Sequence, residues 1–194
     1  MMPTGQVYER QSPGEARRVQ LVTFRLDQHA FAVPVEQVWR VEALADYSLA
    51  SVPGAAAYLE GLINLRGRII PVIDLKTRLG LAQPLEPGAS RSHPPKARLL
   101  IVEMEIAGQK DEKVAMIVDT VNDIRWFAGA SLHPPPPVVA DIDHQYLLGV
   151  LEEEGRLWIV LELRKVLSVE ERRTLSSEAE KGQDSALPAA GDGL

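Results

Sequence analysis

The stretch YLEGLINLRGRIIPVIDLKTRLGL, residues 58–81, decides the fold of this chain because it contains two strand-like segments separated by a glycine. In the first segment, alternation at every second residue predicts that Leu62, Asn64 and Arg66 share one face of a strand. The second segment, Ile69–Leu75, is almost wholly apolar, as in a strand that is buried on both faces. Gly67 supplies the positive φ that a short turn requires. The stretch therefore predicts a β-hairpin.

A second copy of this pattern begins at Tyr146, with the sequence YLLGVLEEEGRLWIVLELRKVL. The copies share their tyrosine, two glycines and the arginine after the turn, and a weaker similarity between residues 35–41 and 118–124 precedes them. We infer an internal duplication that gives the chain two similar halves. The copies differ at residues 64–66, where Asn-Leu-Arg in the first corresponds to Glu152–Glu154 in the second. This difference indicates that the first copy carries a specialised function.

The composition is that of an ordinary soluble globular protein, with 194 residues, of which 45% are hydrophobic and 25% charged. A net charge of −6 and the lack of a basic patch argue against nucleic acid as a partner. The chain has no cysteine, so thiol catalysis and thiolate metal sites are excluded. Its apolar runs are only strand-length and residues 1–10 have no apolar signal core. We therefore expect a cytoplasmic protein without direct membrane insertion.

Short strand-like segments recur through residues 19–168 with little helical periodicity, which predicts an all-β architecture of small barrels with short helices. A Pro-, Gly- and Ser-rich link divides this domain into approximate halves, 19–81 and 98–168, which are expected to form two intertwined β-barrel subdomains. Outside it, we expect a disordered N-terminal arm over 1–18, and a charged helix end followed by a disordered tail over 169–194.

Three segments within the domain are less regular. Residues 36–42 fit either a helical turn or a strand. The charged residues 108–113 are predicted to form a loop between two buried strands. The proline run 134–137 is interpreted as a stiff spacer, and less often such a run is a ligand for a proline-reading module.

No group of residues has the pattern of an active site, so we expect no enzymatic activity and no cofactor. Asp141, Asp143 and His144 could in principle hold a metal, but they lie at adjacent loop positions and a solvated polar loop is the favoured interpretation. Asp119 and Asp123 are interpreted as capping or surface carboxylates, because these roles are commoner than acid–base catalysis.

Arg66 is the best single candidate for a functional residue. The rigid fork of an arginine can clamp a carboxylate or backbone carbonyls of a partner with two hydrogen bonds. An internal salt bridge to Glu152–Glu154 is an equally weighted alternative. Gly61 is also ambiguous, because a strand glycine marks either a bulge or the close approach of another backbone, and its repetition as Gly149 favours a role in the fold.

The segment GLINLRGRIIPVIDL, residues 61–75, closely resembles the signature of the CheW-like family of chemotaxis coupling proteins. Looser similarity extends over residues 19–168 and includes FAVPVEQV at 31–38, VAMIVDTV at 114–121 and YLLGV at 146–150. The resemblance implies two small five-stranded, SH3-like β-barrels that pack around a hydrophobic seam, in agreement with the duplication.

The resemblance also implies a function. It predicts a non-enzymatic adaptor that couples the cytoplasmic tip of a chemoreceptor to the regulatory domain of a CheA-like histidine kinase. Such a protein is recruited to a membrane-associated array, where other CheW-like proteins are further potential partners. The receptor-binding surface of the family would fall on Val38, Gly61, Asn64 and Arg66, whereas the kinase contact cannot be assigned to residues.

One position departs from the family pattern. Many members have an acidic residue two positions after the equivalent of Val38, and this chain has Arg40, with Glu42 nearby. Arg40 is therefore added to the expected receptor-binding surface, and its opposite charge suggests an array with an output other than flagellar taxis. Two alternatives are a regulatory CheW-like protein that competes for receptor or kinase, and a small β-barrel that binds a ligand.

Overall fold

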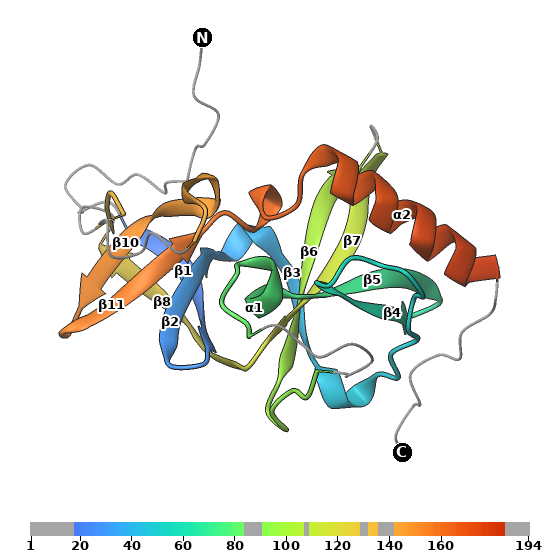
Figure 1. The fold of residues 1–194 in the computed structure, drawn as a ribbon. Coiled ribbons are helices and arrows are strands. Elements are labelled where there is room, and N and C mark those ends of the chain that lie inside the picture. Colours follow the sequence, from blue (N-terminus) through green and yellow to red (C-terminus); the bar gives the residue numbers. More distant parts are fainter. Residues whose placement is uncertain (1–17, 84–90, 107–108, 129–131, 136–141, 185–194) are drawn as a thin grey trace, which may run out of the picture.

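The computed structural model describes residues 18–83, 91–106, 109–128, 132–135 and 142–184, which form two β-sheets lying side by side (Figure 1). Residues 1–17 of the predicted arm and 185–194 of the predicted tail lie outside the described residues, as do part of the Pro-rich link and part of the proline run.

The first sheet, here called barrel 1, has the strand order β3-β6-β7-β5-β4, and the second, barrel 2, has the order β8-β1-β2-β11-β10-β9. The strands of barrel 1 are β3 (Val38–Ala43), β4 (Leu59–Leu65), β5 (Arg68–Asp74), β6 (Arg98–Ile106) and β7 (Gln109–Val118). Those of barrel 2 are β1 (Arg18–Leu26), β2 (His29–Pro34), β8 (Thr120–Ala128), β9 (Leu132–His133), β10 (Leu147–Glu153) and β11 (Arg156–Leu161). The predicted all-β fold with short helices is confirmed, but the expected five strands are found only in barrel 1, because the two-residue strand β9 gives barrel 2 a sixth.

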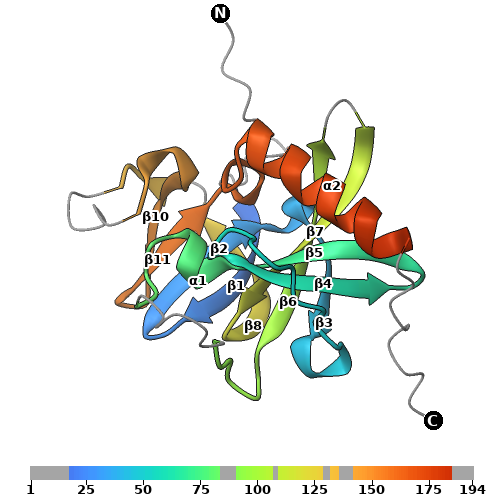
Figure 2. The ribbon, with the colours of Figure 1, turned by 45° about the vertical axis from the view of Figure 1, so that its right-hand side comes forward.

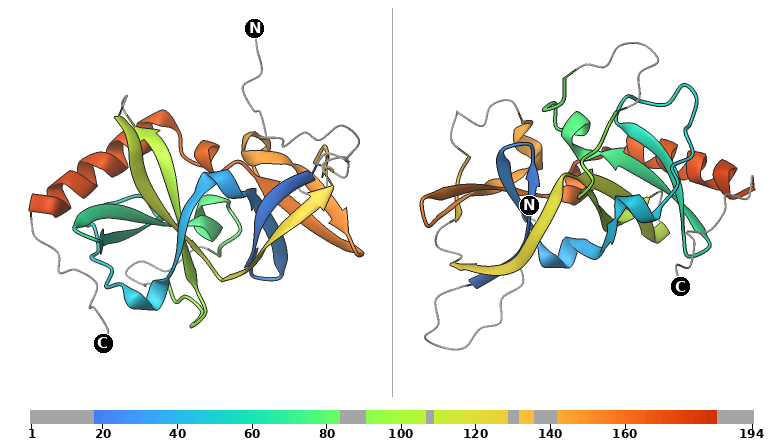
Figure 3. Two further views of the ribbon diagram at one scale, coloured as in Figure 1. Left: turned by 180° about the vertical axis from the view of Figure 1, so that it is seen from behind. Right: turned by 90° about the horizontal axis from the view of Figure 1, so that it is seen from below.

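Each sheet takes strands from both halves of the duplicated sequence. Barrel 1 combines β3, β4 and β5 of the first half with β6 and β7 of the second, and barrel 2 combines β1 and β2 with β8, β10 and β11. The chain crosses between the sheets after β2, through the 3₁₀ turn η1 (Val35–Gln37), and again after β7, at Asp119 (Figure 3). The barrels are therefore built by exchange of strands between the repeats.

Both barrels close through the same joint, a backbone pairing beside a strand glycine. This pairing explains why the glycine recurs as Gly61 and Gly149. In barrel 1 the Ala50 and Leu62 backbones exchange two hydrogen bonds of 2.9 Å, and in barrel 2 the short strand β9 pairs with β10. A Cβ at Gly61 would lie 2.5 Å from the Ala50 carbonyl oxygen, and a Cβ at Gly149 would lie 2.6 Å from that of His133. The register also shifts at both glycines. Both roles expected of Gly61, a bulge and a close backbone approach, are thus present together.

Among the described residues, three apolar clusters make up the core. The largest contains residues of both sheets, among them Phe24 and Phe31, whose rings stack with centroids 5.7 Å apart, and it forms the seam between the barrels. A second cluster around Ile63 fills barrel 1, and a third around Trp158 fills barrel 2. The arrangement agrees with the expected hydrophobic seam, because each sheet has one face toward its own barrel and the other toward its partner.

In the described part of the chain, two α-helices supplement the sheets. α1 (Leu75–Arg78) follows β5 and begins at Asp74, whose carboxylate accepts a hydrogen bond from the Lys76 N–H at 3.0 Å. Lys76 in turn bridges Asp27 at 2.7 Å and Asp119 at 3.1 Å. α2 (Val169–Asp184) lies across barrel 1 and packs along β5 (Figure 2).

Several local expectations are corrected. Residues 36–42, which fitted either a helical turn or a strand, contain both, because η1 is followed by β3. The predicted charged loop over 108–113 is wrong, since β7 begins at Gln109. Arg66 does not lie on a strand face, because β4 ends at Leu65. The charged helix end expected within residues 169–194 is α2, which continues to Asp184.

Candidate functional site

Arg66 and Gly67 form the two-residue turn of the β4–β5 hairpin. The flanking residues, Leu65 and Arg68, pair with each other, and both turn residues have positive φ, 55° at Arg66 and 86° at Gly67. Positive φ at both central positions is the requirement of a type I′ turn. Asn64 Oδ1 accepts a hydrogen bond of 2.7 Å from the Gly67 N–H. The turn therefore projects the Arg66 side chain from the tip of the hairpin.

The Arg66 side chain is exposed, and it forms no ion pair with any residue that the structure describes. The alternative of a salt bridge to Glu152–Glu154 is wrong. These glutamates lie in the β10–β11 hairpin of barrel 2, where Arg125 Nη2 is 3.2 Å from Glu153 Oε2 and 4.0 Å from Glu154 Oε2. The Arg66 guanidinium therefore takes part in no internal ion pair of the described chain.

Arg40 lies on the edge strand β3 and forms an ion pair with Glu42 two residues later. The distance from Arg40 Nη1 to Glu42 Oε1 is 3.1 Å, and the guanidinium also lies 5.1 Å from the centroid of the Trp39 ring. Residues two apart on a strand project from the same face, which brings the two charges together. The opposite charge at position 40 is therefore compensated locally by Glu42.

Tyr47 ends the 3₁₀ turn η2 (Leu44–Asp46), which follows β3. Burial and the nearby charges of Glu42 and Asp46 raise the pKa of its phenol, while Arg66 and Arg40 act in the opposite direction. The ring packs against the cluster that fills barrel 1. Arg40 and Arg66 thus lie within electrostatic range of one phenol, although they are far apart in sequence. We call Arg40, Glu42, Tyr47, Asn64 and Arg66 the Tyr47 surface.

The other two predicted receptor-binding residues are less accessible. Val38 is half-buried against the seam between the barrels, and Gly61 is buried beneath Ala50. The structure therefore places three of the five predicted residues, Arg40, Asn64 and Arg66, around one surface. Val38 and Gly61 lie instead in the interior of the fold.

Exposed aromatic and aliphatic side chains were missed by sequence reasoning. Trp39 is 43% exposed and Val41 is 38% exposed on β3, and the Lys113 ammonium lies 4.7 Å from the Trp39 ring centroid. Ile124 and Trp126 are more than half exposed on β8, the strand of barrel 2 that corresponds to β3. The exposure of Trp39 and Val41 depends on the strand assignment of residues 38–43, which the sequence leaves open.

The carboxylates considered for catalysis or metal binding have structural partners. Asp123 Oδ1 accepts a hydrogen bond from the Thr23 hydroxyl at 2.6 Å, and Asp143 Oδ1 accepts one of 3.0 Å from the Gln145 N–H. Asp141 lies outside the described residues. No cluster of three potential metal ligands occurs among the residues that the structure describes. In the same part of the chain, no helix is long and apolar enough to span a membrane.

The fold defines the class of protein: a small scaffold of two strand-exchanged β-barrels that arose by duplication. The family model of the CheW-like domain matches residues 20–171. This range contains all the strands of both barrels from β2 onward and nearly all of β1. The chain belongs to the CheW-like family.

Individual relatives agree with this assignment. The chemotaxis protein CheW of Rhizobium meliloti (strain 1021) is 31% identical over 153 residues, which cover 79% of this chain and 90% of the relative. Protein FrzA of Myxococcus xanthus is 29% identical over 156 residues, with 79% and 88% covered. The crystal structure of the scaffolding protein TtCheW from Thermoanaerobacter tengcongensis superposes with a TM-score of 0.65 at 32% identity, covering 79% of this chain and 96% of that one.

Proposed function

We propose that this chain is a non-enzymatic adaptor that couples the cytoplasmic tip of a chemoreceptor to a CheA-like histidine kinase. The observation that carries the proposal is the family match over residues 20–171, which spans both barrels and the seam between them. In this proposal the chain is cytoplasmic and reaches a membrane-associated array through its partners. Other CheW-like proteins are candidates for lateral contacts in that array.

The Tyr47 surface is the proposed receptor-binding site. Arg66 projects from a two-residue turn and is not engaged in an internal ion pair with a described residue, so its donors are available to a partner. A guanidinium suits carboxylates and backbone carbonyls because its donors are arranged in a fixed fork. Val38 and Gly61 would support this surface, Val38 through the seam and Gly61 through the joint with Ala50.

Arg40 changes the charge that the Tyr47 surface presents to a partner. Because Arg40 is paired with Glu42, a partner meets two opposite charges on β3 rather than a single positive one. Complementary charges at an interface influence partner choice and association rate more than affinity. We therefore propose that the Arg40–Glu42 pair selects among receptors, and that the array served by this protein need not control flagella.

Co-sedimentation with receptor and kinase tests the proposed site. Arg66→Asp should weaken receptor binding by about 2–5 kcal/mol if Arg66 is a hydrogen-bonded anchor. Glu154→Ala is a matched control, because Glu154 has the equivalent turn position in barrel 2 and a nearly identical φ of 53°. Unchanged receptor binding by a folded Arg66→Asp variant would show that the assigned surface is wrong.

Kinase activity in a reconstituted array separates the adaptor from a competitor. An adaptor should raise receptor-dependent autophosphorylation of the kinase when it is added at sub-saturating concentration. A regulatory relative that binds only one partner should lower it, because each molecule then occupies a site without joining receptor to kinase. The Arg66→Asp variant should lose the activation that the unmodified chain gives.

A further inference from the structure

Side-chain amides hold the Gly67 peptide from two directions. Asn64 Oδ1 accepts the hydrogen bond from the Gly67 N–H at 2.7 Å, and Gln183 Nε2 of α2 donates one of 3.3 Å to the Gly67 carbonyl. Gln183 Oε1 also accepts a hydrogen bond of 2.9 Å from the Ile69 N–H. One Gln183 amide therefore satisfies a carbonyl and an N–H at the start of β5, as a neighbouring strand would do.

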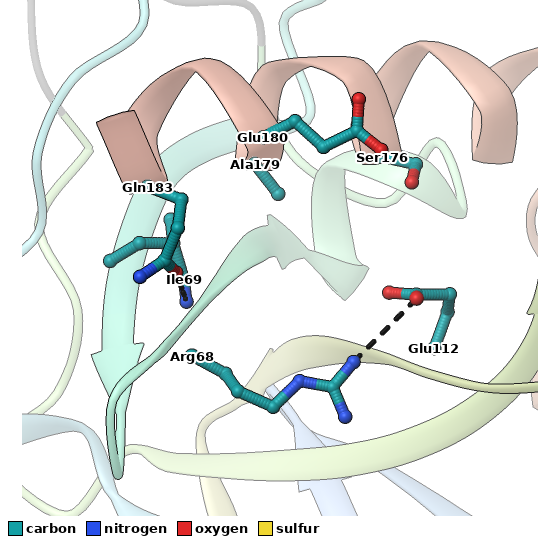
Figure 4. Close-up of a pocket in the computed structure, with 7 residues that line it drawn as sticks. All are labelled: Arg68, Ile69, Glu112, Ser176, Ala179, Glu180 and Gln183. Atoms are coloured by element: carbon teal, nitrogen blue, oxygen red, sulfur yellow. Dashed lines mark hydrogen bonds and ion pairs between the residues drawn. The ribbon is translucent and has the colours of Figure 1, made fainter. Parts of the chain in front are cut away.

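Close packing brings the end of α2 to this hairpin. Gly182 has no side chain, and a Cβ there would lie 2.7 Å from Leu62 Cδ1 and 3.1 Å from Ile69 Cγ2. Figure 4 shows Gln183 beside Ile69, with Ser176 farther along the same helix. The opposite end of the helix is anchored by Glu171, so α2 spans from the centre of the molecule to the turn that carries Arg66.

The second repeat provides an internal comparison. Its turn, Glu154–Gly155, has φ values of 53° and 72°, close to those of the first turn. Within the described chain, no side chain hydrogen-bonds the Gly155 peptide, and the residue equivalent to Asn64 is the exposed Glu152. This turn therefore forms, in the described chain, without side-chain hydrogen bonds to its glycine. The hydrogen bonds that join Asn64 and Gln183 to Gly67, here called the clamp, are present only at the hairpin on which the recognition residues are proposed.

The helix that supplies the clamp also lies mostly beyond the family domain. The match to the CheW-like model ends at residue 171, whereas α2 continues to Asp184. Gln183 is thus contributed by a part of the chain that the family model does not include. A residue outside the common domain can give this chain a property that the domain alone does not specify.

We propose that Gln183 is a positioning residue for Arg66, which fixes the β4–β5 turn against α2 before a partner binds. This inference rests on the proposed function, because it assumes that Arg66 contacts the receptor. An exposed hairpin tip that moves freely must be ordered on binding, and this ordering reduces affinity. By holding the turn in advance, the Gln183 amide lowers that cost without touching the partner.

The experiment compares Gln183→Ala with Ser176→Ala, a control on the same helix. The probes are soluble cytoplasmic tip fragments of the chemoreceptors encoded in the same genome, titrated by calorimetry, and the Ile69 amide is followed by hydrogen exchange. We expect Gln183→Ala to accelerate Ile69 exchange and to weaken receptor binding about fivefold, with a melting temperature changed by about 4 °C or less. Ser176→Ala should change none of these. Gln183→Glu keeps the acceptor for Ile69 but loses the donor to Gly67, and its affinity should be intermediate.

Three outcomes would overturn the positioning role. If Arg66→Asp weakens binding but Gln183→Ala does not, the surface is correct and the clamp is irrelevant to it. If Gln183→Ala and Ser176→Ala weaken binding equally, the effect is general to the helix. If Arg66→Asp leaves binding unchanged, the proposed recognition surface itself fails, and the positioning role fails with it.

Discussion

Arg78 Nη2 and Glu171 Oε2 lie 3.1 Å apart and join α1 to the first turn of α2. The Arg78 guanidinium is also 5.4 Å from the ring centroid of Tyr58 and 5.2 Å from that of Tyr146. The two tyrosines occupy equivalent positions in the two repeats, so the arginine lies where the repeats meet. Glu171 therefore attaches α2 to the centre of the duplicated fold.

Glu171→Gln should destabilise the protein in a pH-dependent manner. Burial raises the pKa of Glu171, but hydrogen bonds from Ser168, together with Arg78 and Tyr58, outweigh burial and lower it below the ordinary value of 4.5. A lowered pKa means that the ionised carboxylate contributes stability above that ordinary value, which is lost as the pH falls through the folded-state pKa. At pH 7 the variant should lose about 1–2 kcal/mol in urea unfolding, and the difference from the unmodified chain should shrink below pH 4.5.

Glu178→Gln is the control for this prediction. Glu178 also pairs with a cation on α2, at 2.7 Å from Lys181, but the lysine side chain is 69% exposed. Exposed pairs of this kind contribute little, so the change should stay within about 0.5 kcal/mol. Equal losses in the two variants would contradict a special role of Glu171 in holding α2.

Gly61→Ala should destabilise barrel 1 by about 3 kcal/mol or more. The added Cβ would lie 2.5 Å from the Ala50 carbonyl oxygen, and this backbone cannot retreat without breaking its hydrogen bonds to Leu62. Gly149→Ala should have a similar effect in barrel 2, because its Cβ would lie 2.6 Å from the His133 carbonyl oxygen. Thermal and urea unfolding of both variants measure the loss.

Gly54→Ala measures the cost of a left-handed φ at a position where an added Cβ meets no neighbouring atom. Gly54 has a φ of 73°, but a Cβ there would meet nothing within 4 Å. Only the conformational cost remains, which is about 1 kcal/mol. If Gly54→Ala were as damaging as Gly61→Ala, the close approach to Ala50 would not be the reason for the glycine.

The hairpin, the duplication and the all-β class could be predicted from sequence because each has a local signal. Period-two alternation marks β4, Gly67 marks the turn, and the repeated Gly61 and Gly149 mark the joint that closes each barrel. The exchange of strands between the repeats could not be predicted in this way. It depends on which sheet contains β1 and β2, and no local sequence pattern indicates the sheet to which a strand belongs.

The candidate site was only partly predictable for the same reason. Arg66 was found because its equivalent in the second repeat is a glutamate, but its position in the turn was not, since alternation placed it on a strand. Tyr47 and Gln183 were missed. Tyr47 interacts electrostatically with Arg66, and Gln183 hydrogen-bonds Gly67; interactions between residues so distant in the chain have no local sequence signal.

Trp39→Ala should weaken partner binding while leaving the fold intact. Trp39 is 43% exposed on the edge strand β3, and two cations, Arg40 and Lys113, lie within about 5 Å of its ring centroid. An exposed aromatic side chain beside cations is the type of residue that dominates binding energy at interfaces. We expect at least about a tenfold loss of affinity for receptor tip fragments or the kinase regulatory domain, measured by calorimetry, and a stability change below about 1 kcal/mol.

Trp158→Ala provides the opposite pattern. Trp158 is 2% exposed in the core of barrel 2, and its ring contacts Phe127 edge to face with centroids 6.0 Å apart. Removing a buried tryptophan should lower the free energy of unfolding by about 3–5 kcal/mol. Any loss of binding by this variant should therefore follow from its loss of folded protein. If Trp39→Ala instead lost stability to the same extent, or bound both partners as tightly as the unmodified chain, β3 would have no part in recognition.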